Sequence, residues 1–382
     1  MRRMTIVAVL VVGPAIWCAA APEQKPARVG PDPELWKQTV HKALRFLQNN
    51  QAEDGSFSKE RSLGVTGIVV AGALKTGLAS VDDAWIARSL KFIESLVNEK
   101  EGHIAGIKPR DQLKNYVTAV NVMALVEANR DGRYERIVSM AAHYLKELQW
   151  DEGEGKAPQD DFYGGAGYDS KSRPDLSNTQ FFVDALVAAG VKEDDPHLKK
   201  ALVFISRCQN LKSEYNDQPW AGKINDGSFI YSAAGGGETK ADVLPDGGLT
   251  GYGSMTYAGV KSMIYAGVDK NDKRVQAALA WLRKHYTVDE NPGMPKARNQ
   301  QGLYYYYHTM AKCLHLLGED YFVDDRGVRH DWRADLTLAL AKRQRPDGSW
   351  VNLNDRWMEG DPNLVTGYAL LTLAYCKPPR SN

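Results

Sequence analysis

The chain has 382 residues, of which 43% are hydrophobic, so it holds enough apolar material for one large domain or two ordinary ones. Its 48 Lys and Arg residues nearly balance its 47 Asp and Glu residues, which leaves no net field to attract nucleic acid or an anionic membrane. We therefore expect no nucleic-acid partner. The four cysteines include no CxxC pair and predict neither a disulfide framework nor a zinc cluster.

The first segment of the chain has the features of a secretory signal. Two early arginines precede an apolar run over residues 5–17, and small residues follow at 19–21. The run is too short to cross a bilayer comfortably. We predict a cleaved signal peptide over residues 1–21, a linker over residues 22–33, and export to the periplasm or the cell exterior with no membrane segment left. The alternatives are an uncleaved anchor and lipidation at Cys18.

Six segments after the linker predict amphipathic surface helices. In each of them apolar residues recur at i, i+3, i+4 and i+7 with charged residues between them. The segments are Leu35–Asn50, Ala84–Val97, Tyr134–Gln149, His197–Gln209, Lys273–Tyr286 and Trp332–Arg343.

Six further apolar stretches alternate with these helices, and each contains a threonine. The stretches are VTGIVVAGAL, VTAVNVMAL, NTQFFVDAL, MTYAGVKSM, HTMAKCL and VTGYALLTL, with the threonines at Thr66, Thr118, Thr179, Thr256, Thr309 and Thr366. They hold few charges and many small residues, so we predict that they are buried helices.

This alternation predicts an all-α fold of the α/α toroid type, in which six inner helices pack inside six outer helices. Successive threonines lie 52, 61, 77, 53 and 57 residues apart, which fits one repeated hairpin with loop insertions. We expect a single toroid domain over residues 34–377, a tail over residues 378–382, and a monomer. A linear helical solenoid is the alternative, since periodicity alone does not exclude it.

A seven-residue motif occurs near both ends of the predicted domain. QAEDGSF stands at residues 51–57, QRPDGSW at 344–350, and a partial copy, NDGSF, at 225–229. The first two follow the end of an outer helix, so Gly55 and Gly348 would take a positive φ and the preceding aspartates would cap the turn. The glutamine of each motif would bond to backbone groups of a neighbouring helix end. We predict that the motif stabilises contacts between repeats and has no catalytic role.

These motifs resemble the QW motifs of squalene-hopene cyclases and oxidosqualene cyclases. The six-hairpin pattern resembles the prenyltransferase and squalene oxidase repeat family over roughly residues 34–377. The resemblance implies the α/α toroid of squalene cyclases and of protein prenyltransferase β subunits. It does not fix the function, because the family also includes proteins with no assigned chemistry.

The cyclase chemistry of this family depends on one acidic residue. Squalene-hopene cyclases carry D-x-D-D-T at the start of an inner helix, where the central acid protonates an alkene. The matching stretch here is DLSNT at residues 175–179, in which Ser177 replaces that acid and Asn178 replaces its neighbour. A serine hydroxyl is far too weak an acid for this step, so we expect no standard squalene cyclisation unless another acid acts. The remaining candidate acids are Asp161, Asp175 and Asp246.

The prenyltransferase chemistry of the family depends on zinc. The β subunits bind it through an Asp and a Cys near the start of one inner helix and a His in a sequence similar to YYHTMAKCL here. His308 matches that histidine, but the aligned region LTGYGSMTY offers Thr250 and Tyr252, which are not usual zinc ligands. We predict no metal and no other cofactor. Export would also separate the chain from cytosolic protein and prenyl diphosphate substrates.

The N-terminal ends of the inner helices would face one mouth of the toroid, where free N–H groups bind anions or polarised groups. Polar and aromatic residues gather there, namely Asn115, Tyr116, Asp175, Asn178, Tyr252, Tyr307, His308, Asp361 and Asn363. We predict catalytic roles for Asp175, Tyr307, His308 and Asp361, and substrate contacts at Asn178, Tyr252, Tyr304 and Trp357. The alternatives are that the aspartates are helix caps, that the histidine is a satisfied buried one, and that the tyrosine run 304–307 is packing.

Three function classes fit these features. The leading hypothesis is an exported toroid that binds or acts on a terpenoid-like apolar substrate, with terpene cyclase-like chemistry if the chain is an enzyme. The alternative is a polysaccharide lyase or hydrolase, in which Tyr307 acts as base or acid with His308 beside it and Asn178 neutralises a uronate carboxylate. The third is a non-catalytic scaffold. The expected ligand is a small molecule, either a lipid or a glycan.

Overall fold

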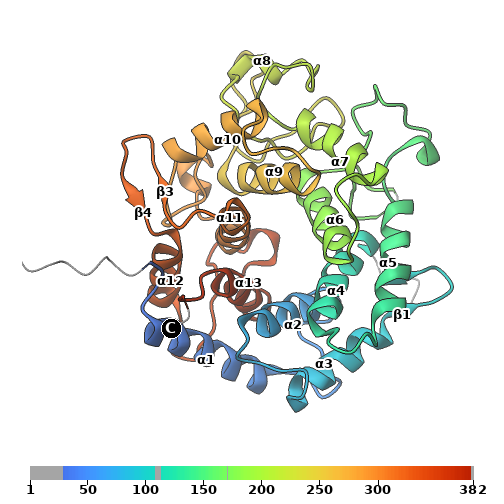
Figure 1. Cartoon of the computed structure of the whole chain (residues 1–382), viewed down its shortest axis with the longest axis vertical. Helices are drawn as coiled ribbons and strands as arrows, with labels where there is room; N and C mark the ends of the chain where they lie inside the picture. Colours follow the sequence, from blue (N-terminus) through green and yellow to red (C-terminus); the bar gives the residue numbers. More distant parts are fainter. Residues whose placement is uncertain (1–28, 108–112, 170, 380–382) are drawn as a thin grey trace, which may run out of the picture.

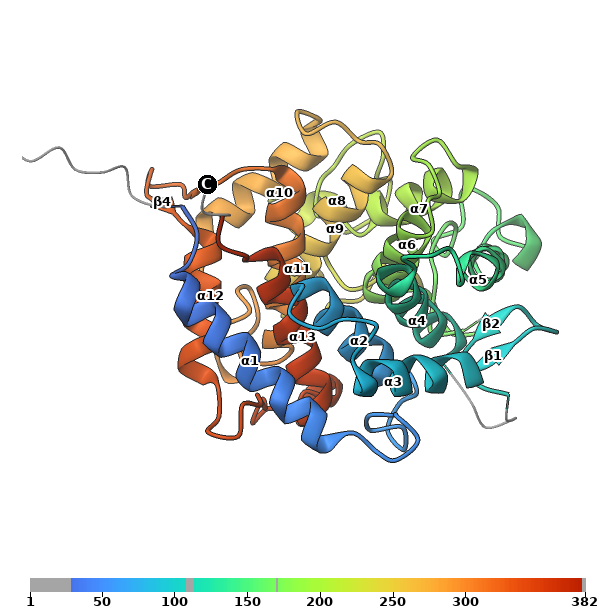
Figure 2. The same ribbon diagram turned by 60° about the horizontal axis from the view of Figure 1, so that its bottom comes forward.

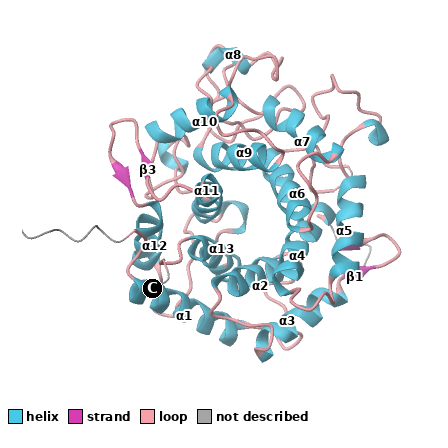
Figure 3. Cartoon of the chain, viewed as in Figure 1, coloured by secondary structure: helices cyan, strands magenta, loops and turns pink. Residues whose placement is uncertain are grey.

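The computed structural model describes residues 29–107, 113–169 and 171–379. The predicted signal peptide lies outside these residues, as do residues 22–28 of the predicted linker and residues 380–382 of the predicted tail. Two concentric rings of helices form the fold (Figure 1), and helices make up nearly all of its regular structure (Figure 3). The predicted α/α toroid is therefore the observed fold.

The inner ring consists of six helices that pack against one another in chain order. They are α2 (Val65–Thr76), α4 (Lys114–Ala128), α6 (Leu176–Ala188), α9 (Gly253–Tyr265), α11 (Leu303–Leu317) and α13 (Pro362–Tyr375). The last inner helix, α13, packs against the first, α2, so the ring is closed and the linear solenoid is excluded. Almost every residue of these helices is buried, as their apolar sequences predict.

The outer ring covers the inner one with six amphipathic helices. They are α1 (Pro33–Asn50), α3 (Ala84–Ser95), α5 (Glu135–Glu147), α7 (Pro196–Arg207), α10 (Lys273–Lys284) and α12 (Trp332–Arg343). Helix α1 packs against both α12 and α13, so the first outer helix adjoins the last repeat (Figure 2). The two ends of the described chain also meet there, since a Cβ added at Gly30 would lie 3.0 Å from Pro379 Cδ.

The loops between the helices of the two rings carry the remaining elements. They include two short hairpins, β1 (Val97–Asn98) with β2 (His103–Ile104) and β3 (Phe322–Val323) with β4 (Arg329–His330), of which the second precedes α12. The short helices are α8 (Ala221–Ile224), η1 (Glu152–Glu154), η2 (Lys296–Arg298) and η3 (Arg356–Met358). The longest of these loops, residues 208–252, joins α7 to α9 and explains the largest gap between threonines.

The repeated motif ties the outer helix that it follows to the next outer helix. Gln344 Nε2 donates to the Thr39 carbonyl of α1 at 2.9 Å and to the Gly348 carbonyl at 3.0 Å, and Gln51 makes the equivalent bonds to α3. Gly348 has a φ of +94° and lies directly against the backbone of α1 at Lys42. The turn therefore requires glycine both for its backbone conformation and for its close approach.

Two further glutamines make the same bonds without an intact motif. Gln149 Nε2 donates at 2.9 Å to the carbonyls of Gly164 and of His197, which lies in α7. Gln209 Nε2 donates to the carbonyls of Gly227, at 3.1 Å, and of an α10 residue, Arg274, at 2.8 Å. Loop insertions separate these glutamines from their glycine turns, which hides the motif in the sequence.

The recurring threonines connect each turn to its own inner helix. In five repeats the threonine hydroxyl accepts a bond from a backbone N–H just after the outer-to-inner turn. The donors are Phe57 for Thr66, Ile104 for Thr118, Ala166 for Thr179, Phe229 for Thr256 and Trp350 for Thr366, at 3.0 to 3.4 Å. The threonine therefore satisfies an N–H group that burial would otherwise leave unpaired.

None of the helices within residues 29–107, 113–169 and 171–379 combines the length and the apolar character that crossing a bilayer requires. Three cysteines of the described chain, Cys208, Cys313 and Cys376, are buried free thiols.

Candidate functional site

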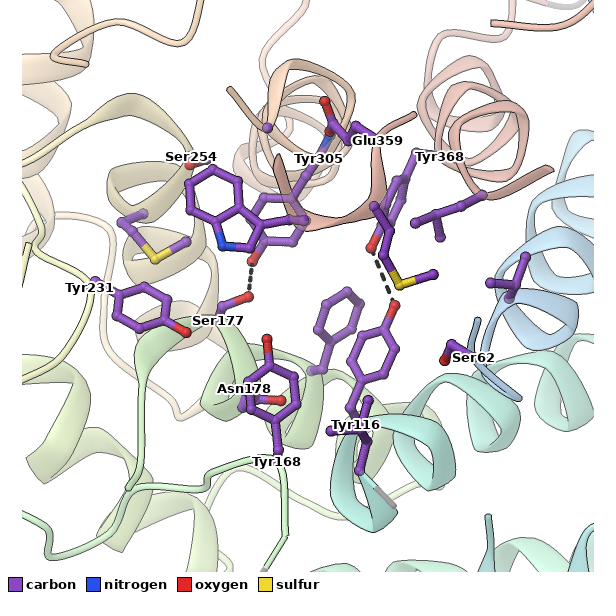
Figure 4. Close-up of a pocket in the computed structure, with 18 of the residues that line it drawn as sticks. Ser62, Tyr116, Tyr168, Ser177, Asn178, Tyr231, Ser254, Tyr305, Glu359 and Tyr368 are labelled. Atoms are coloured by element: carbon purple, nitrogen blue, oxygen red, sulfur yellow. Dashed lines mark hydrogen bonds between the residues drawn. The ribbon is translucent and has the colours of Figure 1, made fainter. Parts of the chain in front are cut away.

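An apolar cavity of about 240 Å³ opens among the N-terminal turns of the inner helices (Figure 4). All six inner helices contribute to its wall. One lining residue from each is Val65, Tyr116, Ser177, Met255, Tyr305 and Leu364. The outer-to-inner loops complete the wall, so the cavity lies on the side of the ring where the longest loops gather. The inserted loops and the N-terminal helix ends thus line the same cavity.

Aromatic rings form most of the cavity wall, which we call the tyrosine cavity. Six tyrosines, one phenylalanine and one tryptophan line it among the described residues, namely Tyr116, Tyr168, Tyr231, Tyr252, Tyr305, Tyr368, Phe181 and Trp357. Several of these rings pack edge to face, such as Tyr116 on Phe181 with centroids 5.2 Å apart. Such contacts fix the rings and turn their carbon surfaces toward a ligand.

Four hydroxyl groups of the cavity are paired with one another. Ser177 Oγ donates to Tyr305 Oη at 3.1 Å, and the hydroxyls of Tyr116 and Tyr368 lie 3.4 Å apart, as the dashed lines of Figure 4 show. Burial raises the pKa of Tyr116 to about 12, and it raises the pKa of Tyr305 as well. These phenols are therefore neutral hydrogen-bonding groups at physiological pH and do not supply a base.

Two buried carboxyl groups near the cavity are both bound to helix ends. Asp175 caps α6, where its Oδ1 accepts from Asn178 N and its Oδ2 from Asn178 Nδ2, each at 2.8 Å. Glu359 accepts from Tyr305 N in the first turn of α11 at 2.8 Å and from Asn352 Nδ2 at 2.7 Å. Burial raises the pKa of Asp175 to about 6 and that of Glu359 to about 7. Both acids therefore titrate near neutrality, but each accepts one hydrogen bond from a backbone N–H group and one from an asparagine side chain.

The loop that carries Trp357 is held in a strained conformation at the cavity mouth. Trp357 has a φ of +58° and Met358 a φ of +66°, a region that L-residues rarely occupy. The loop is fixed by bonds from Asn352 N to Glu359 O at 2.8 Å and from Gly360 N to Asp355 Oδ1 at 2.7 Å. Two consecutive strained residues cost about 1–3 kcal/mol each and are typical of functional sites.

The structure brings some of the predicted site residues together and separates others. Asn178, Tyr252 and Trp357 line the tyrosine cavity, as predicted substrate contacts would, although their roles stay predictions. Tyr304 lies outside it, in a groove with Arg343 and Asn352. Asp175 lies behind the wall as the cap of α6.

The other predicted catalytic residues are not among the described residues that line the cavity. Tyr307 is turned outward, where its hydroxyl donates to the Val288 carbonyl. Asp361 caps α13 by accepting from Leu364 N at 3.1 Å. This is the helix-cap role that we gave as the alternative to a catalytic one. The expected convergence of these groups at one mouth therefore does not occur, because α11 points Tyr305 inward in place of Tyr307.

His308 lies one turn deeper in the ring and is fully buried. Its ring stacks on Tyr368 with centroids 6.0 Å apart, and neither ring nitrogen has a hydrogen-bond partner among the described residues. Burial, together with repulsion from Lys312 and Lys261, lowers the pKa of His308 to about 3. The imidazole is therefore neutral, and it is not the satisfied histidine that we gave as the alternative.

A buried ionic cluster that the sequence analysis missed lies deeper still, between α6, α9 and α11. Asp184 Oδ1 accepts from Lys261 Nζ at 2.6 Å, and its Oδ2 lies 2.8 Å from Lys312 Nζ. Gln180 Oε1 accepts a second bond from Lys261 at 2.5 Å. Burial lowers the pKa of Lys261 to about 8 in spite of Asp184. The cluster links three inner helices, and its signal in the sequence was a charge within each of three otherwise apolar stretches.

No group of three or more His, Cys, Asp or Glu side chains suited to a metal ion occurs in the part of the chain that the structure describes. The neighbours of His308 are lysines and a tyrosine, so the residues at this position do not fit the zinc site of the prenyltransferases.

Comparisons with known proteins support the fold but do not identify a family. No protein-family model matches the chain, and no curated protein matches it by sequence. A glycosyl hydrolase family 88 protein from Bacteroides vulgatus is similar over 89% of this chain and 98% of its own, with 9% identity and a TM-score of 0.51. The type II terpene cyclase MstE from Scytonema is similar over 89% and 98%, with 16% identity and a TM-score of 0.46. The likeness to the hydrolase supports the α/α toroid and concerns the fold alone.

Proposed function

We propose that the chain binds a compact, terpenoid-like apolar molecule in the tyrosine cavity. The observation that carries this proposal is the wall itself, in which eight aromatic rings surround the cavity and four hydroxyls are paired with one another. Such a wall offers carbon surface and few free polar groups, which suits a ligand that gains free energy by leaving water.

The size of the cavity limits the ligand. Its volume of about 240 Å³ lies at or below the lower end of the usual range for small-molecule sites, about 300–1,000 Å³. We therefore propose a compact ligand, such as a ten-carbon terpenoid.

We propose binding without proton-initiated cyclisation. The position of the cyclase acid is Ser177, whose hydroxyl donates to Tyr305. Asp175 and Glu359 could carry a proton at neutral pH, but their oxygens accept hydrogen bonds from the ends of α6 and α11. An acid in this state is poorly placed to transfer a proton to an alkene.

The glycan alternative is less well supported by this wall. A sugar needs several free hydrogen-bonding groups around its ring, whereas the described lining offers, beside the aromatic rings, the Asn178 amide, three serines and the Glu359 carboxyl group, which already accepts bonds from Tyr305 N and Asn352 Nδ2. Ser177 is already bonded to Tyr305.

The proposal is tested by calorimetric titration of the purified protein with geraniol and, separately, with an unsaturated uronate disaccharide. We expect saturable binding of geraniol and none of the disaccharide. Trp357→Ala removes one ring of the wall and should weaken geraniol binding at least about tenfold, which is about 1.4 kcal/mol. Trp150→Ala removes a tryptophan that contacts Phe162 away from the cavity and serves as the control. Binding of the disaccharide but not of geraniol would refute the proposal.

A further inference from the structure

A second hollow, of about 250 Å³, adjoins the tyrosine cavity at its mouth. It is lined by Lys240, Arg298, Gln301, Arg356 and Trp357, and we call it the basic hollow. Trp357 belongs to both walls, so one indole separates the apolar cavity from three cationic side chains. Among the described residues, no carboxylate lines this hollow.

The basic hollow is built by three loops that hydrogen bonds and ring contacts hold together. Lys240 lies in the loop before α9, with its ammonium 4.4 Å from the centroid of the Tyr231 ring. Arg298, in η2, donates to the Lys240 carbonyl at 3.2 Å. Arg356, in η3, lies over the Trp357 ring at 5.4 Å. Two of the three cations thus rest on aromatic rings of the adjoining cavity, which fixes them at its mouth.

The positive charge of the hollow is only partly balanced by neighbouring acids. Glu238 pairs with Lys240 and also with Arg173, and Asp242 lies 3.7 Å from Arg298. Arg356 makes no ion pair with any described residue. The pKa of Lys240 is lowered, first by burial and then by repulsion from Arg356 and Arg173. Cations that repel one another in a partly desolvated hollow attract an anion.

We infer that the basic hollow binds the anionic head group of the ligand, a carboxylate or a phosphate, while the apolar part of the same molecule lies in the tyrosine cavity. This inference rests on the proposed function and specifies the ligand class as an anionic amphiphile. The two arginines supply planar donors suited to either head group. The same inference explains the strained backbone at Trp357 and Met358. This backbone conformation places Arg356 and the Trp357 indole side by side where the tyrosine cavity meets the basic hollow.

The test compares three probes with one ten-carbon skeleton: geraniol, geranate and geranyl phosphate. We expect at least one anionic probe to bind the wild-type protein about tenfold or more tightly than geraniol at low salt. Added salt should reduce this ratio, since screening weakens charge attraction at an exposed mouth. The probe that gains more affinity distinguishes a carboxylate site from a phosphate site.

Substitutions test whether the preference for anionic probes arises in the basic hollow. Arg356→Gln should reduce the anion-to-geraniol affinity ratio about fivefold or more, and Arg298→Gln provides a second test should the first variant fold poorly. Arg136→Gln removes an exposed arginine that pairs with Glu99 on the outer surface and should leave the ratio unchanged. If geraniol binds and neither anion binds better, this inference is wrong and the proposed function stands. If none of the three probes binds, both are wrong.

Discussion

Replacing Gly348 by alanine tests the contact between the last repeat and the first outer helix. A Cβ at this position would lie 2.7 Å from the Lys42 carbonyl carbon and 3.2 Å from Lys42 Cβ. The first distance is about 1 Å shorter than a normal contact between two carbon atoms. The positive φ costs an L-residue about 1–2 kcal/mol. Moving the turn away from α1 would also weaken the two Gln344 bonds, at about 0.5–1.5 kcal/mol each. We therefore expect a loss of about 2–5 kcal/mol in the free energy of unfolding.

The assay is urea unfolding followed by circular dichroism, with Gly155→Ala as the matched control. Gly155 also has a positive φ, of +71°, but an added Cβ there would meet nothing within 4 Å. The control should therefore show only the backbone cost of about 1–2 kcal/mol. Equal losses for the two variants would show that the close approach to α1 contributes nothing, and would refute this account of the motif.

Two further predictions concern buried ionisable groups. Asp184→Asn leaves two lysines without their carboxylate and should lower the free energy of unfolding by about 3–5 kcal/mol in the same urea assay. Asp131→Asn, at an exposed ion pair, should leave it nearly unchanged. Glu359 has a folded pKa raised to about 7 from an ordinary 4.5, so its contribution to stability is fully present below pH 4.5 and is lost as the pH rises through 7. Glu359→Gln should therefore reduce the fall in stability between pH 5 and pH 8, and an unchanged fall would contradict the assignment.

The ring of helices could be predicted because its physical signals are local. Outer helices alternate apolar and charged residues with the helical period, and inner helices are apolar with few charges, so both classes are visible in single segments. The motif could be recognised in the sequence only where the glutamine stands four residues before the glycine, as in QAEDGSF and QRPDGSW. Gln209 and Gly227 make the same contact across an insertion, which only the fold brings together.

The candidate site was harder to predict because it depends on the rotation of helices and on loop positions. In the run of four tyrosines at residues 304–307, every residue has the same side chain, so the sequence does not indicate which one faces the ring centre. The structure turns Tyr305 into the cavity and Tyr307 away from it. Tyr168 and Tyr231 come from irregular loops without any periodic signal. Asn178, Tyr252 and Trp357 reach the wall from helix ends and loops, and their roles as substrate contacts stay predictions.

The bond from Gln344 to Thr39 means that the chain has no terminal repeat. A linear array of repeats needs polar capping units at its ends, because each outermost unit lacks a neighbour. Here the last turn binds the first outer helix with the contact that joins earlier repeats, and the ends near residues 30 and 379 adjoin. The contacts that close the ring therefore do not depend on which hairpin comes first along the chain. A circularly permuted chain, opened in a different outer-to-inner loop and joined across residues 379 and 30, would present the same set of contacts.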